Sequence, residues 1–139
     1  MAYCNAFHLM TRINCIPVEE LSRQHLVAEY RELPRVFALA RKAALRGFTA
    51  EDGPEEYTLG KGHVLFFYTR LRYLALRQQQ LVNEMLRRGY QPNFTDSLFE
   101  NYADIPAYMW QDWTPTESAL RLNRERIAER LAQQDKPSV

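Results

Sequence analysis

The first long helical hydrophobic pattern lies between residues 18 and 46. At about 100° per residue, an apolar stripe faces away from a basic and polar stripe. The apolar stripe comprises Leu26, Leu33, Phe37, Ala40 and Ala44. The opposite stripe comprises Gln24, Arg31, Arg35, Lys42 and Arg46. The pattern predicts a helix that begins between Val18 and Ser22 and ends at Arg46, with Pro34 dividing it into two parts.

A second apolar stretch, residues 63–88, predicts another long helix. One face is marked at spacings of three and four by Val64, Phe67, Leu71, Leu74, Gln78, Leu81 and Met85. Other apolar residues lie around this face, which is typical of a helix at the centre of a fold. Gly89 follows as a natural end of the helix.

A third helix is predicted from a capping box, with Thr114 as N-cap, Pro115 at the first helical position and Glu117 at the third. Its apolar line comprises Leu120, Ile127 and Leu131. The connections, residues 48–60 and 90–113, are long and lack periodicity. The second is rich in aromatic residues, which we expect to pack in the core. The predicted fold is all-α: a compact single domain of three main helices with long irregular connections.

Composition narrows the class of protein. The 139 residues, 46% hydrophobic and 25% charged, suit one globular domain. No apolar run is long enough for a membrane span, and residues 1–10 lack the pattern of a signal peptide. Two cysteines indicate a reducing compartment, and we expect a cytoplasmic protein. Cys4, His8, Cys15 and His25 match no zinc-binding spacing, so we expect neither a metal nor a cofactor.

The net charge of +1 conceals a basic surplus on the first two helices. Residues 61–90 alone carry six bases and one acid. Such a surplus suits a phosphate-binding face, although a basic stripe is more often a solvated helix surface. Glu32 falls where the basic stripe meets the apolar face, with His25 close by. The pattern leaves three classes open: an enzyme acting on DNA, a nucleic-acid-binding module without catalysis, and a helical interaction protein. On pattern alone, an ion pair with Arg31 or Arg35 is the commoner role for Glu32.

Several segments together resemble the bacteriophage-type pyrimidine-dimer DNA glycosylases. The longest are Met10-Thr11-Arg12-Ile13-Asn14, Gln24-His25-Leu26 and the run from Ala28 to Phe37, followed by Arg41-Lys42, Gly62-His63-Val64 and Asp104-Ile105-Pro106. The resemblance extends from residue 10 to about 133. It implies a compact three-helix enzyme, monomeric and nucleoid-associated, of bacterial or phage type. Its substrate would be double-stranded DNA containing cyclobutane pyrimidine dimers or abasic sites. The enzyme would remove the 5′ base of the dimer and then nick the abasic site.

The resemblance also implies roles for individual residues. The nucleophile would be the α-amine of Thr11, and the essential carboxylate would belong to Glu32. The residues expected to bind DNA are Arg12, Gln24, His25, Arg31, Arg35, Lys42, Arg126 and Arg130. Of these, Arg126 and Arg130 match phosphate-contacting positions on the third helix.

The sequence departs from that family at both ends. Residues 1–10 form an extension before the glycosylase-like domain, residues 11–139, and while they remain Thr11 has no free amine. We expect translation to begin at Met10 or the extension to be trimmed; a protein that retained it would bind damaged DNA without cleaving it. The family's aromatic, basic C-terminal tail has no counterpart in residues 135–139. We therefore expect activity on abasic sites to be less affected than recognition of dimers.

Overall fold

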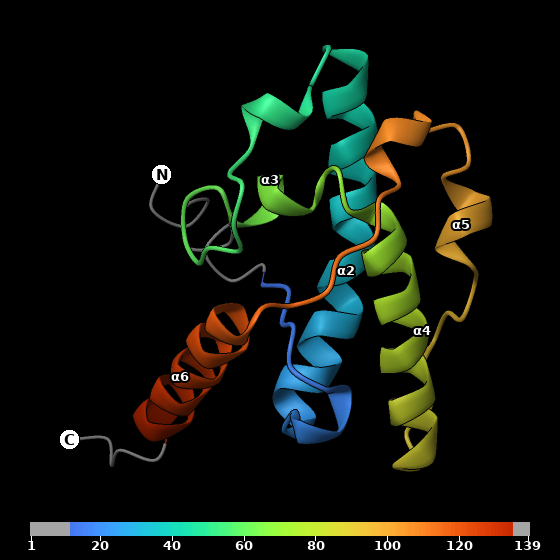
Figure 1. Ribbon diagram of the computed structural model, residues 1–139. Helices are drawn as coiled ribbons and strands as arrows, with labels where there is room; N and C mark the ends of the chain where they lie inside the picture. The colour runs from blue at the N-terminus through green and yellow to red at the C-terminus, as the bar shows by residue number, and fades with distance from the viewer. Residues whose placement is uncertain (1–11, 135–139) are drawn as a thin grey trace, which may run out of the picture.

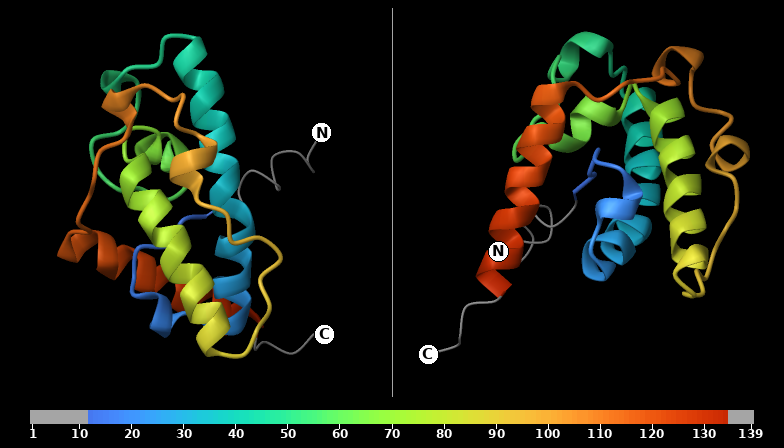
Figure 2. Two further views of the ribbon diagram at one scale, coloured as in Figure 1. Left: turned by 90° about the vertical axis from the view of Figure 1, so that its right-hand side faces the viewer. Right: turned by 60° about the horizontal axis from the view of Figure 1, so that its bottom comes forward.

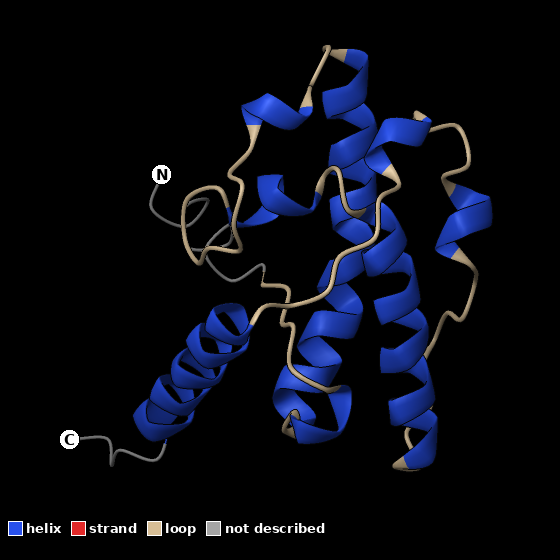
Figure 3. Cartoon of the chain, viewed as in Figure 1, coloured by secondary structure: helices blue, strands red, loops and turns tan. Residues whose placement is uncertain are grey.

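The computed structural model describes residues 12–134, and every regular element in that part of the chain is a helix (Figures 1 and 3). The α-helices are α2 (Arg23–Leu45), α3 (His63–Phe67), α4 (Leu71–Arg87), α5 (Leu98–Asn101) and α6 (Glu117–Gln134). Three short 3₁₀ helices are η1 (Val18–Glu20), η2 (Ala50–Asp52) and η3 (Ala107–Met109). The prediction of an all-α fold with three main helices, α2, α4 and α6, is confirmed. Over the same residues, no helix is both long and apolar enough to cross a membrane.

Helix α2 is the predicted long helix and begins and ends close to the predicted positions, and it continues through Pro34 as one α-helix. Ser22 is its N-cap, and the Ser22 side chain accepts a hydrogen bond from the backbone N–H of His25. Pro34 lies inside the helix and has no N–H for the carbonyl of Tyr30. The side-chain amide of Gln78 donates to that carbonyl at 3.1 Å instead. A residue of α4 thus supplies the hydrogen bond that Pro34 removes, which helps the helix to continue.

The predicted single helix over residues 63–88 is wrong, because the chain breaks between α3 and α4. The carbonyl of Thr69 accepts a hydrogen bond from the backbone N–H of Gln111. Arg70 leaves the helical conformation, with φ −126° and ψ 41°, and its guanidinium donates to the carbonyl of Phe66 at 2.6 Å. The break is therefore held by contacts with the distant segment around residue 111. Both helices still turn their apolar faces to the core.

The third predicted helix exists, but its cap is at a different residue. Helix α6 begins at Glu117, and the Thr116 hydroxyl accepts from the N–H of Ala119 at 3.1 Å. Thr116, not Thr114, thus occupies the N-cap position. The expected apolar line is also incomplete, because Leu131 is 36% exposed. The buried residues of α6 are Ala119, Asn123 and Ile127.

The core lies between α2 and α4, which pack side by side (Figure 1). Residues that are completely buried there include Leu26, Leu33, Val36, Phe37, Leu71, Leu74 and Leu81. Most aromatic residues of the 90–113 segment pack against this core, as predicted: Tyr90, Phe99, Tyr102, Trp110 and Trp113. Phe94 and Tyr108 are 43% and 44% exposed.

Helix α6 lies apart from the α2–α4 pair, and the extended residues 12–17 run between them (Figure 1 and the right-hand view of Figure 2). We call these six residues the lead-in segment. The backbone N–H groups of Cys15 and Ile16 donate to the side-chain oxygen of Asn123 on α6, at 2.8 and 3.2 Å. The lead-in segment therefore connects α6 to the rest of the fold.

Candidate active site

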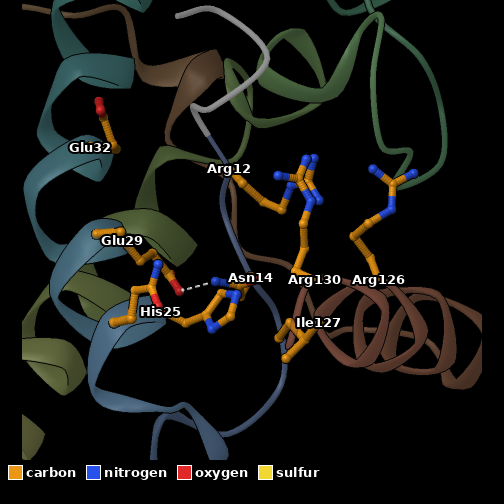
Figure 4. Close-up of a pocket in the computed structure, with 10 residues that line it drawn as sticks. Arg12, Asn14, His25, Glu29, Glu32, Arg126, Ile127 and Arg130 are labelled. Carbon is orange, nitrogen blue, oxygen red and sulfur yellow. Dashed lines mark hydrogen bonds between the residues drawn. The ribbon is translucent and has the colours of Figure 1, made fainter. Parts of the chain in front are cut away.

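A pocket of about 130 Å³ opens where α2, the lead-in segment and α6 meet (Figure 4). Its lining comprises Gln24, His25, Ala28, Glu29 and Glu32 from α2, Arg12 and Asn14 from the lead-in segment, and Arg126, Ile127 and Arg130 from α6. Six of the ten residues that the sequence proposed for the site therefore lie together. The pocket combines a carboxylate on one wall with several guanidinium groups on the other.

Glu32 provides the accessible carboxylate of the pocket. Its side chain is 21% exposed, and Oε2 lies 3.3 Å from Nη1 of Arg35, one turn along the same helix. The two groups are within ion-pair distance, yet Oε2 is buried and takes part in no hydrogen bond of acceptable geometry among the described residues. Because the side chain as a whole is 21% exposed, the carboxylate can still take a proton or a hydrogen bond from a molecule bound in the pocket.

Three arginines form a cationic cluster on the opposite wall. Arg12 enters from the lead-in segment, and Arg126 and Arg130 project from α6 (Figure 4). Partial burial, followed by the charges of Arg126 and Arg130, lowers the pKa of the Arg12 guanidinium. Arg126 also forms an ion pair with Glu129 at 3.6 Å. Like charges brought this close are stabilised by an anion, and the phosphates of DNA fit this requirement.

His25 contributes a neutral imidazole to the pocket. Its Nδ1 lies 2.8 Å from the hydroxyl of Ser22, the N-cap of α2. Partial burial, together with the charges of Arg12 and Arg130, lowers the pKa of His25 below its ordinary value of 6.5. The ring is therefore mostly uncharged at neutral pH and acts as a hydrogen-bonding group.

A buried ion pair beneath the pocket was missed by the sequence interpretation. Glu29, 1% exposed, accepts from Nε and Nη2 of Arg77 at 2.8 and 3.0 Å and from the side-chain amide of Asn14 at 3.0 Å. Asn14 in turn accepts from Asn123 at 2.8 Å. Burial alone would lower the pKa of Arg77, but the charge and hydrogen bonds of Glu29 outweigh it and raise that pKa. The signal available in the sequence was a charged residue on the core-facing side of each helix, Glu29 on α2 and Arg77 on α4.

The other proposed site residues lie elsewhere. Arg31, Arg35 and Lys42 are exposed on α2 and are not part of the pocket lining. They form a separate basic surface on the same helix. Thr11, the proposed nucleophile, lies outside the described residues.

The proposed absence of a metal can be compared with the structure only in part. Cys4 and His8 lie outside the described residues, and Cys15 is buried. Within residues 12–134, no group of three or more histidine, cysteine, aspartate or glutamate side chains is arranged to hold a metal ion.

Comparison with known families covers the part of this site that comes from the lead-in segment and α2. The model of the family described as pyrimidine dimer DNA glycosylase matches residues 10–98, which is more than half of the chain. The match includes the lead-in segment and all of α2, and so Arg12, His25 and Glu32. The arginines of α6 lie beyond it and are joined to the site by their position in the fold. The chain belongs to the pyrimidine dimer DNA glycosylase family.

Proposed function

We propose that this protein is a DNA glycosylase and abasic-site lyase that acts on pyrimidine dimers, with the α-amine of Thr11 as nucleophile and Glu32 as the essential carboxylate. The observation that carries the proposal is the pocket in which Arg12, the neighbour of Thr11 in the chain, lies opposite Glu32. Consecutive Cα atoms are about 3.8 Å apart, so a nucleophile at residue 11 is tied to a residue of the pocket. The active form would begin at Thr11, without residues 1–10.

The chemistry needs only these two groups. An N-terminal amine has a pKa near 8, so a fraction of it is neutral and nucleophilic at neutral pH. Its nitrogen bonds to the sugar C1′ while the bond from C1′ to the base breaks, and the base leaves with the bonding electrons and takes up the first proton that the amine loses. The second amine proton passes to the ring oxygen as the sugar ring opens, and an imine remains. Glu32 then takes a proton from C2′, and the electrons of that C–H bond expel the 3′ phosphate. The partly exposed carboxylate of Glu32, in the lining of the pocket, suits this step.

The arginines would hold the DNA around the reacting sugar. The cluster of Arg12, Arg126 and Arg130 offers contacts to phosphates next to the pocket. The exposed Arg31, Arg35 and Lys42 extend the basic surface along α2. Damaged duplex is easier to distort than intact duplex, and this difference would contribute to selectivity.

Borohydride trapping tests the proposal. A protein that begins at Thr11 should form a covalent complex with DNA containing an abasic site when the imine is reduced, and it should nick dimer-containing DNA. Glu32→Gln should abolish nicking while binding to damaged duplex remains. Glu51→Gln, an exposed acid in η2, is the matched control and should nick at the parent rate.

Two results would contradict the proposal. Absence of trapping by the protein that begins at Thr11 would exclude the amine mechanism, and normal nicking by Glu32→Gln would exclude that carboxylate. The full chain should bind damaged duplex without trapping, because Thr11 then has no free amine. Retention of residues 1–10 would thus leave a damaged-DNA-binding protein without catalysis.

A further inference from the structure

The lead-in segment is held in place by side chains from distant parts of the chain. It has no regular secondary structure before η1, yet Ile13 is completely buried and Ile16 is 3% exposed. Apart from the carbonyl of Pro17, which accepts from the backbone N–H of Glu20, its backbone hydrogen bonds go to side chains from distant parts of the chain. Asn123 accepts from Cys15 and Ile16, and Arg77 donates to the carbonyl of Ile16 at 2.6 Å. A segment bonded in this way has one defined path into the pocket.

Two residues that precede α4 form hydrogen bonds with the backbone of Ile13, one with its N–H and the other with its carbonyl. His63 Nε2 accepts from the N–H of Ile13 at 2.8 Å. The hydroxyl of Tyr57 donates to the carbonyl of Ile13 at 3.0 Å. The two rings meet edge to face, with centroids 5.6 Å apart. We call His63 and Tyr57 the Ile13 clamp.

The partners of His63 define its tautomer. Its Nδ1 lies 2.7 Å from the carbonyl of Thr58, which can only accept, so Nδ1 carries the proton. Nε2 then has the free lone pair that the N–H of Ile13 requires. The local backbone sets the position of the ring. His63 is the first residue of α3, and Gly62 before it has φ +87°. That left-handed conformation favours glycine.

We propose that His63 and Tyr57 are positioning residues for the glycosylase and lyase reactions, because by clamping Ile13 they hold the chain that leads to Thr11, two residues earlier in the sequence. The inference rests on the proposed function, since it concerns the same nucleophile. Neither residue is in the lining of the pocket. Their effect would therefore fall on the rate of imine formation and not on the binding of DNA.

The two possible amide replacements of His63 separate the clamp from general packing. In His63→Gln, the side-chain oxygen can occupy the place of Nε2 and accept from Ile13. In His63→Asn, the amide can replace Nδ1 and donate to Thr58, but nothing reaches Ile13. Misplacement of a reacting group by about 1 Å costs on the order of 10²-fold in rate, so we expect His63→Asn to trap abasic-site DNA about 10²-fold more slowly and His63→Gln to remain near the parent rate. Affinity for the duplex should be unchanged in both.

Tyr57→Phe gives a second test that does not remove a buried ring. It deletes only the hydroxyl that donates to Ile13, and it should slow single-turnover trapping by about tenfold without weakening DNA binding. Tyr68→Phe is the control, a buried tyrosine of the same core, and should trap at the parent rate. All proteins would begin at Thr11 and be compared at neutral pH.

The outcomes distinguish this inference from the proposed function. If the parent protein does not trap, the amine mechanism fails and the positioning role fails with it. If the parent traps and Tyr57→Phe traps equally fast, the clamp has no role in catalysis. Equal losses in His63→Gln and His63→Asn would likewise assign His63 to packing. Slower trapping in His63→Asn and Tyr57→Phe, with His63→Gln near the parent rate, would support the inference.

Discussion

Acidification should destabilise the fold through His63. Its side chain is buried, at 4% exposure, between the rings of Tyr57 and Phe67. Burial lowers the pKa of His63 from its ordinary value of 6.5 to about 4, and the positive charge of Arg12 acts in the same direction, while the hydrogen bond to Thr58 opposes them. Protonation would also place an N–H on Nε2, opposite the N–H of Ile13.

The sign and size of the effect follow from linkage between protonation and folding. The unfolded chain binds a proton at His63 below pH 6.5, whereas the folded chain does so only below about 4. Stability from this residue is thus present above pH 6.5, falls as the pH decreases towards 4, and changes little below that. At about 1.4 kcal/mol per pH unit, the loss between pH 7 and pH 4 is about 3 kcal/mol, of which about 1 kcal/mol falls between pH 6 and pH 5.

Urea denaturation at a series of pH values tests this reasoning, with His63→Gln as the comparison. The parent protein should lose about 1 kcal/mol more than the variant between pH 6 and pH 5. This interval separates the effect of His63 from that of Glu84. Hydrogen bonds from Arg87 and Arg88 lower the pKa of Glu84 to about 2, so the stability that Glu84 contributes is lost only as the pH falls below about 4.5. Comparison with the variant also cancels the contribution of His25. Equal slopes in the two proteins would refute the buried, neutral state of His63.

Two further predictions concern α6. Arg126→Ala should reduce the magnitude of the slope of log binding constant against log salt concentration by about 1. Arg121→Ala, outside the arginine cluster, should leave this slope unchanged. Equal slopes for Arg126→Ala and the parent would place the phosphate contacts elsewhere. Thr116→Ala should lower the free energy of unfolding by about 1 kcal/mol because it removes the N-cap acceptor, and Thr114→Ala should change it by less than about 0.5 kcal/mol. Urea denaturation of the two threonine variants measures these changes. A larger loss of stability in Thr114→Ala than in Thr116→Ala would show that Thr114 is the N-cap.

The parts of the fold that the sequence predicted depend on local spacing. The apolar stripe of α2 is buried from Leu26 to Ala40 where the 3.6-residue period places it, Ala44 at its end is half-buried, and the basic stripe is exposed. The break after Phe67 was not predicted, because it depends on a contact between distant parts of the chain. It is held by a hydrogen bond from Gln111 to Thr69, and the apolar pattern continues through it because α3 and α4 both face the core. Periodicity reports which side of a helix is buried, and not whether a distant segment interrupts it.

The site shows the same division between local and distant information. The helical wheel placed Glu32 at the edge of the core beside Arg35, and the structure has both the 3.3 Å ion pair and the pocket. The two interpretations of Glu32 are therefore compatible, since the side chain that pairs with Arg35 also lines the pocket and is 21% exposed.

The lead-in segment could not be assessed from its own residues. Its residues have no helical period and form extended chain, but this says nothing of how firmly that chain is held. The constraints come from His63, Arg77 and Asn123, which lie 50 to 108 residues away along the sequence from the backbone groups that they bind. Those residues stand out only as polar groups on otherwise buried faces. An irregular segment with several buried polar partners is held by tertiary contacts in place of secondary structure, and the proposed role of Thr11 would depend on these contacts.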